Sequence, residues 1–230
     1  MRVAAIATLL FAPSLAAANI VEARYSGETT RYIHGVFGND SEYGALDLRF
    51  ADGTTKQIVL PENRVFEDRV PRLADLDGDG DNEAIVVETD VNLGAQLAVY
   101  DENGKVAGTP FIGMCNRWLA PAGIADFDGD GQNDIAYVET PHLGKVLMFW
   151  TLKDGELVKI AEASGLTNHR FGEPETSGGV RTCADATELV LADASWRNVV
   201  AVRLKNGTPA FATIGPYNGP ESITAALGCR

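Results

Sequence analysis

Short apolar runs separated by turn residues cover most of the chain after residue 19. The runs over residues 84–89, 95–100 and 135–140 are rich in valine, isoleucine, tyrosine and threonine, which favour β-strands. Between such runs lie glycine, asparagine and aspartate, as in the turn 101–104, Asp-Glu-Asn-Gly. This pattern predicts an all-β protein of short antiparallel strands joined by tight turns.

The predicted strands recur in sets of four, and each set spans about 53 residues. Strands are expected over 20–25, 31–37, 45–50 and 56–60 in the first set, and a further strand over 222–227 follows the last. Four-stranded units repeated around an axis are the blades of a β-propeller. We therefore expect a small propeller of four blades, closed by pairing of the terminal strand with the N-terminal blade. A partial ring or an open stack of the same units is the alternative.

Two nine-residue segments share one acidic pattern, beginning at Asp75 and at Asp126. Each has acidic residues at positions 1, 3, 5 and 9, and glycines at positions 4 and 6 that permit a tight loop. Carboxylates that face one point repel one another unless a hard cation lies between them, and Ca²⁺ accepts six to eight oxygen ligands. Position 7 is expected to contribute its backbone carbonyl. The sequence thus predicts two Ca²⁺ sites, with the ligand candidates Asp75, Asp77, Asp79, Asp81 and Glu83 in the first and Asp126, Asp128, Asp130, Gln132 and Asp134 in the second.

The residues that flank these loops distinguish them from other types of calcium-binding loop. An EF-hand has glutamate at position 12 and a helix on each side, whereas position 12 here is Val86 or Tyr137 within a predicted strand. A calcium loop between two strands, once in about fifty residues, resembles the FG-GAP (VCBS-type) repeat of integrin-like β-propellers. The resemblance implies that each loop joins the first two strands of a blade and binds calcium.

A third copy of the unit lacks the metal loop. Ala184 and Asp185 match the start of the other loops and Glu188 matches their last acidic position, but the two acids are three positions apart instead of eight. This copy is expected to bind no metal.

The first 18 residues have the pattern of a secretory signal peptide. Arg2 precedes an apolar run, and three alanines at 16–18 form a small-residue cleavage site. We expect a mature single domain over 19–230, secreted or periplasmic, without membrane insertion after cleavage. The formal net charge of −13 argues against nucleic acid as a partner.

Export permits a disulfide among the three cysteines. Cys183 lies in a predicted first strand, and Cys229 ends the predicted terminal strand. Because first strands of adjacent blades lie side by side, we expect a Cys183–Cys229 bond that closes the ring and leaves Cys115 as a thiol.

Three arginines recur at intervals of 53 residues, at Arg64, Arg117 and Arg170. In one interpretation each forms an ion pair with a carboxylate of a neighbouring blade, from the series Glu88, Glu139 and Asp193. In the other, the guanidinium groups bind an anionic ligand at the axial mouth. The candidate ligand-binding residues are Arg31, His34, Arg64, Arg117, Trp118 and Arg170.

No catalytic motif of the HExxH, GxSxG or CxxC type occurs in the sequence. We therefore expect a non-catalytic interaction module whose ligand is a protein or a glycan. A secreted hydrolase or lyase with an axial active site, and a structural component of an envelope assembly, are the alternatives.

Overall fold

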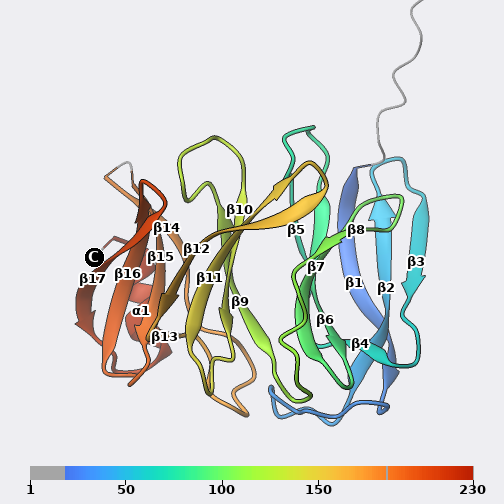
Figure 1. Cartoon of the computed structure of the whole chain (residues 1–230), viewed down its shortest axis with the longest axis horizontal. Helices are drawn as coiled ribbons and strands as arrows, with labels where there is room; N and C mark the ends of the chain where they lie inside the picture. The colour runs from blue at the N-terminus through green and yellow to red at the C-terminus, as the bar shows by residue number, and fades with distance from the viewer. Residues whose placement is uncertain (1–18, 185, 230) are drawn as a thin grey trace, which may run out of the picture.

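The computed structural model describes residues 19–184 and 186–229. The predicted signal peptide, residues 1–18, lies outside the described residues, as does Asp185 of the third copy. Within the described ranges the chain is all-β with one short helix, so the predicted fold class is confirmed at this level. The strands form three antiparallel sheets that follow one another along the longest axis of the molecule (Figure 1).

The first sheet contains eight strands in the order β1-β2-β4-β6-β7-β8, with β3 paired to β2 and β5 paired to β6, and it curls into a half-barrel. Its strands are β1 (Ile20–Thr29), β2 (Glu42–Phe50), β3 (Thr55–Val59), β4 (Arg64–Phe66), β5 (Arg72–Ala74), β6 (Glu83–Asp90), β7 (Gly94–Tyr100) and β8 (Lys105–Gly108).

The second sheet is a single meander of four strands: β9 (Leu119–Ala125), β10 (Asp134–Glu139), β11 (Val146–Lys153) and β12 (Glu156–Ser164). The third sheet has five strands: β13 (Leu166–Thr167), β14 (Gly179–Cys183), β15 (Ala186–Asp193), β16 (Asn198–Lys205) and β17 (Thr208–Pro216). The helix α1 (Pro220–Leu227) packs against this third sheet.

Three of the four predicted units are present as four-stranded meanders, β5–β8, β9–β12 and β14–β17. The four-blade propeller itself is not confirmed. Strand β4 pairs with both β2 and β6 and thereby merges the N-terminal strands with the next unit into one sheet. In Figure 1 the N-terminal strands β1–β3 and the C-terminal strands β16 and β17 lie at opposite ends of the row of sheets.

Two predicted strands are wrong. Residues 31–37 belong to a loop between β1 and β2, and residues 222–227 belong to α1, so they cannot close a ring as a strand. Pro220 at the start of α1 and Glu221 in its first turn favour a helix N-terminus. Ile223 and Ala226, three residues apart, then face the third sheet together.

Neighbouring sheets bury each other's faces, in one apolar cluster between the first and second sheets and another between the second and third. All residues of β6 and β7 are buried, as expected for strands covered on both sides. Between the second and third sheets the approach is close: a Cβ atom at Gly123 would lie 2.5 Å from Val180 Cγ2 and 2.9 Å from Leu189 Cδ1. Glycine at this position therefore lets β9 pack directly on β14 and β15.

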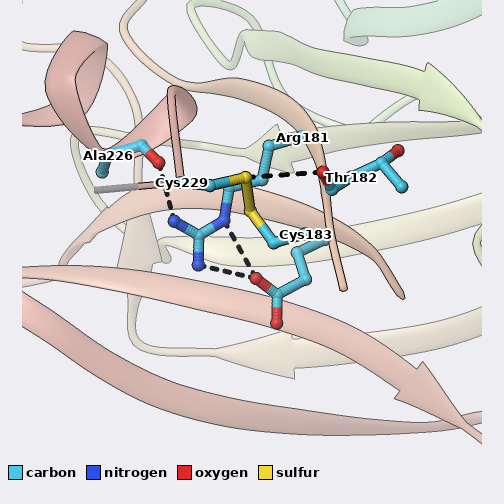
Figure 2. The surroundings of a disulfide bond; sticks show 6 residues. Arg181, Thr182, Cys183, Ala226 and Cys229 are labelled. Atoms are coloured by element: carbon cyan, nitrogen blue, oxygen red, sulfur yellow. Dashed lines mark hydrogen bonds and ion pairs between the residues drawn. A yellow bond between two sulfur atoms is a disulfide. The ribbon is translucent and has the colours of Figure 1, made fainter. Parts of the chain in front are cut away.

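The disulfide between Cys183 and Cys229 is present, and Cys115 is a free, exposed cysteine, as predicted. The expected role of the bond is wrong, however, because Cys229 follows a helix. The bond fastens the end of α1 to β14 (Figure 2). Beside it, Arg181 Nη1 donates a hydrogen bond to Ala226 O, 2.7 Å away, and ties the same helix to the sheet. None of the helices in the described part of the chain has the length and apolar character needed to cross a membrane.

Candidate metal centres and a histidine-lined end

The two acidic loops have the same hydrogen-bonding pattern. In the first loop, Asp75 accepts hydrogen bonds from the backbone N–H groups of Gly78 (2.7 Å) and Gly80 (3.1 Å). In the second, Asp126 accepts from the corresponding Gly129 (2.6 Å) and Gly131 (3.0 Å). All four glycines have φ between 80° and 96°, the left-handed region that glycine adopts without strain. The repeated motif therefore folds into a repeated loop.

Each loop is anchored at both ends. Position 2, Leu76 or Phe127, is buried in the core, and its backbone N–H donates to the acid at position 9. That acid, Glu83 or Asp134, is itself buried at the start of the second strand of the unit. The loop thus holds one buried carboxylate beneath the exposed ones.

In each loop three carboxylates converge. One oxygen from each of Asp75, Asp77 and Glu83 lies within 4.8 Å of the other two, and Asp126, Asp128 and Asp134 form the equivalent group. The remaining predicted ligands are outside these triads: Asp79 accepts from Asp81 N (2.8 Å), and Asp130 accepts from Gln132 N (2.8 Å).

The electrostatics of the triads favour a cation. Burial, together with the charges of Asp77, Asp79 and Asp75, raises the pKa of Glu83 to about 7, against the hydrogen bond from Leu76. Burial likewise raises the pKa of Asp134 to about 6. The charges of Asp128 and Asp130 raise it as well, whereas hydrogen bonds from Phe127 N–H and the hydroxyl of Thr151 lower it. A metal ion would supply the positive charge that the triad lacks, and an all-oxygen donor set suits a hard cation such as Ca²⁺ or Mg²⁺.

The opposite end of the molecule brings other predicted residues together. In Figure 1 the metal loops lie at the upper end, and the turns after β6 and β10 lie at the lower end. At the lower end His34, Arg117 and Trp118 line a pocket of about 200 Å³, and Arg170 lines a neighbouring pocket of similar volume. Trp118 is 2% exposed and its indole N–H donates to Glu67 O (2.8 Å), so its stacking partners are within the protein.

Arg31 and Arg64 line neither of these two pockets. Arg31 Nε donates to Arg64 O (2.8 Å), and Arg64 Nη1 pairs with the buried Glu88 (2.7 Å). Arg64 therefore pairs with one carboxylate of the predicted series, but the two residues lie on adjacent strands of one sheet and not on separate blades. In the described ranges, neither Arg117 nor Arg170 pairs with Glu88, Glu139 or Asp193.

Sequence reasoning did not assign His142, His169, Phe171 or Glu67 to this end. The imidazole of His34 lies 2.7 Å from the buried Glu67, and His142 Nε2 lies 2.9 Å from His169 Nδ1. His142 lies in the turn between β10 and β11, whereas His169 follows β13, and spacing alone does not show that they meet. One sequence feature does relate Phe171 to this end of the molecule: Phe171 follows Arg170, just as Trp118 follows Arg117.

No protein-family model matches the chain, and no curated protein is similar to it in sequence.

Proposed function

We propose that the protein is an exported calcium-binding interaction module built from FG-GAP-type units. The single observation that carries the calcium assignment is the convergence of three carboxylates, Asp126, Asp128 and the buried Asp134, within one loop. Carboxylates this close repel one another, and a hard cation between them compensates their charge. The same loop geometry occurs at Asp75, so the proposal covers two sites.

The units support the FG-GAP resemblance in one further respect. In both metal-loop units the acidic loop joins the first and second strands of a four-stranded meander. We propose that these units are propeller-type blades held in an open stack, which was the alternative to a closed ring. The disulfide suits an oxidising compartment, and we propose that the protein is secreted or periplasmic.

The metal proposal is tested by a calcium titration that resolves the two loops. The amide resonances of Gly80 and Gly131 each report one loop in a two-dimensional NMR spectrum. We expect both to shift, with dissociation constants on the order of 10⁻⁴–10⁻³ M, as in other extracellular modules. Asp77→Asn should weaken binding at Gly80 roughly tenfold and leave Gly131 unchanged, and Asp128→Asn should do the reverse.

The matched control is Asp154→Asn, which removes one negative charge from an exposed turn outside the metal loops. It should leave both titrations unchanged. If neither glycine amide responds to Ca²⁺, or if Asp154→Asn weakens binding as much as Asp77→Asn does, the calcium proposal fails.

A further inference from the structure

All three histidines of the chain meet at the end opposite the metal loops, although they lie at positions 34, 142 and 169. His142 and His169 pack with ring centroids 5.1 Å apart, and both lie near the ring of Trp118. His34 and His142 both lie beside Phe171, at centroid distances of 6.0 and 5.5 Å. Four segments that are distant in the sequence therefore build one aromatic cluster.

Two adjoining pockets open at this cluster, each of about 200 Å³. They share Pro141, His142 and Phe171 as lining residues. Phe171 is 60% exposed, so its ring offers an apolar surface at the boundary between the two pockets. An extended ligand of two rings can occupy both pockets and contact this ring.

The pockets differ from the rest of the molecule in charge. The chain has 32 acidic and 19 basic residues, yet neither pocket is lined by an aspartate or a glutamate. Arg117 lines the first pocket, and Lys145 and Arg170 line the second. The guanidinium of Arg170 stacks over Trp196 at 4.4 Å from the ring centroid, which fixes its position. A cation in each pocket favours a ligand with negative charges.

The carboxylates closest to these groups already have partners. Glu67 is fully buried and interacts with His34 Nδ1 (2.7 Å) and with the hydroxyl of Thr89 (2.6 Å). Glu173 Oε1 lies 3.8 Å from Arg170 Nη1. Arg117 has no carboxylate partner in the described part of the chain, and its guanidinium donates to Asn116 O (3.1 Å).

The hydrogen bonds of the histidine pair fix their tautomers. His169 Nε2 lies 3.0 Å from the carbonyl of Glu173, which can only accept, so Nε2 carries the proton and Nδ1 is an acceptor. His142 Nε2 must then donate to it, which leaves His142 Nδ1 as an acceptor. Burial and the neighbouring His169 lower the pKa of His142 to about 4, so the ring stays neutral at pH 7. A ligand at His142 therefore meets an acceptor that requires a donor such as a hydroxyl group.

We propose that the two pockets bind an acidic oligosaccharide, with one uronic-acid ring in each. The carboxylates face Arg117 in one pocket and Lys145 and Arg170 in the other, a ring hydroxyl donates to His142, and a sugar C–H face packs on Phe171. An acidic peptide supplies the negative charges but has no hydroxyl group beside them, so it should fit these pockets less well than an acidic sugar does. This inference rests on the proposed role as an interaction module and names its ligand class, but it does not depend on the metal loops.

The test is a titration with digalacturonate, followed through the indole N–H resonance of Trp118, which lines the first pocket. Excess Ca²⁺ is held constant, because acidic sugars bind calcium themselves. We expect the Trp118 resonance to shift saturably. Arg117→Met and Arg170→Met should each weaken binding on the order of tenfold, because each removes a charge-assisted hydrogen bond. The exposed Arg24, on the first sheet, provides the matched control Arg24→Met, which should bind as the wild type does.

Two further ligands test whether binding needs both the charges and the hydroxyl groups, and one further variant tests whether it needs the metal loops. The dimethyl ester of digalacturonate keeps the hydroxyls but lacks the charges and should bind weakly. A tetra-aspartate peptide carries the charges without the hydroxyls and should also bind weakly. The variant Asp77→Asn/Asp128→Asn should bind digalacturonate normally, so that failure of the calcium proposal is distinguishable from failure of this one.

The proposal is overturned if digalacturonate causes no saturable shift at millimolar concentration, or if the peptide binds as tightly as the sugar. It is also overturned if Arg24→Met weakens binding as much as Arg117→Met does. Should Arg170→Met prove unfolded by circular dichroism, Arg117→Met alone still decides, because Arg117 makes no ion pair in the described ranges.

Discussion

At the residue scale, several acidic side chains are buried for reasons unrelated to metal. Glu42 of β2 is 1% exposed, and one of its carboxyl oxygens is buried without a hydrogen-bond partner. Burial and the charge of Glu67 together raise the pKa of Glu42 to about 8, against hydrogen bonds from Asn39 and Gly35. Glu42 therefore favours the protonated form in the folded state more than in the unfolded state.

We expect Glu42→Gln to change how stability depends on pH. The stability that protonated Glu42 contributes is fully present below pH 4.5, its ordinary pKa, and is lost as the pH rises towards 8. Glutamine keeps the shape without the titration. The variant should match the wild type near pH 4.5 and exceed it by up to a few kcal/mol above pH 8.

Urea unfolding at pH 4.5 and pH 8.5 measures this difference. The exposed Glu62 gives the control Glu62→Gln, which should show no comparable gain. An equal free energy of unfolding for Glu42→Gln and the wild type at pH 8.5 would contradict the expected burial effect.

At the element scale, the attachment of α1 depends on few contacts. Its apolar face, Ile223 and Ala226, packs on β15 and β16, and its C-terminal end is held by the Cys183–Cys229 bond. Arg181 pairs with Glu188 through two nitrogens, at 2.9 and 2.6 Å, and also donates to Ala226 O. The group around the disulfide in Figure 2 therefore connects β14, β15 and α1.

Removing the disulfide should loosen α1 before the rest of the molecule unfolds. The bond spans 46 residues, and the chain-entropy estimate for such a loop is roughly 3–4 kcal/mol. We expect Cys183→Ser/Cys229→Ser to lower the free energy of unfolding by up to this amount. Hydrogen exchange should accelerate first in residues 220–227.

The corresponding control is Cys115→Ser, which removes a free, exposed cysteine and should leave stability unchanged. Uniform acceleration of exchange across all three sheets in the double variant would contradict a local role of the bond. A non-reduced digest in which Cys115 is linked to either other cysteine would contradict the pairing itself.

At the scale of the whole molecule, the two metal loops are physically connected. Asn133, the eighth residue of the second loop, donates through Nδ2 to the carbonyl of Asp75 in the first loop (2.9 Å). The equivalent Asn82 donates to Asn19 Oδ1 and to Ile20 O, at the start of β1. In each loop, the asparagine at position 8 thus donates hydrogen bonds to a segment that lies earlier in the chain.

This connection predicts that calcium binding at one loop affects the other. Asn133→Ala removes the hydrogen bond that steadies Asp75, so the first loop should bind Ca²⁺ severalfold more weakly, as judged from the Gly80 amide. Asn103→Ala, in an exposed turn, is the control and should have no effect. A dissociation constant for the first loop that does not change in Asn133→Ala would show that the loops bind independently.

The sequence by itself determined the features that depend on consecutive residues. Nine residues contain all the groups that fold each acidic loop, so Asp75, Asp77 and Glu83 could be assigned together, as could Asp126, Asp128 and Asp134. The three four-stranded meanders follow from local strand and turn patterns. The disulfide was predicted correctly, although residues 222–227 were predicted as a strand and belong to α1.

The tertiary structure decided whatever depends on distant segments. Pairing of β4 with both β2 and β6 merged two predicted units into one sheet, and no local pattern specifies that pairing. The meeting of His34, His142 and His169 likewise depends on how the loops of successive units pack, since 108 and 27 residues separate them along the chain. Local sequence fixes the fold of each acidic loop, whereas the stacking of sheets fixes which loops share an end of the molecule.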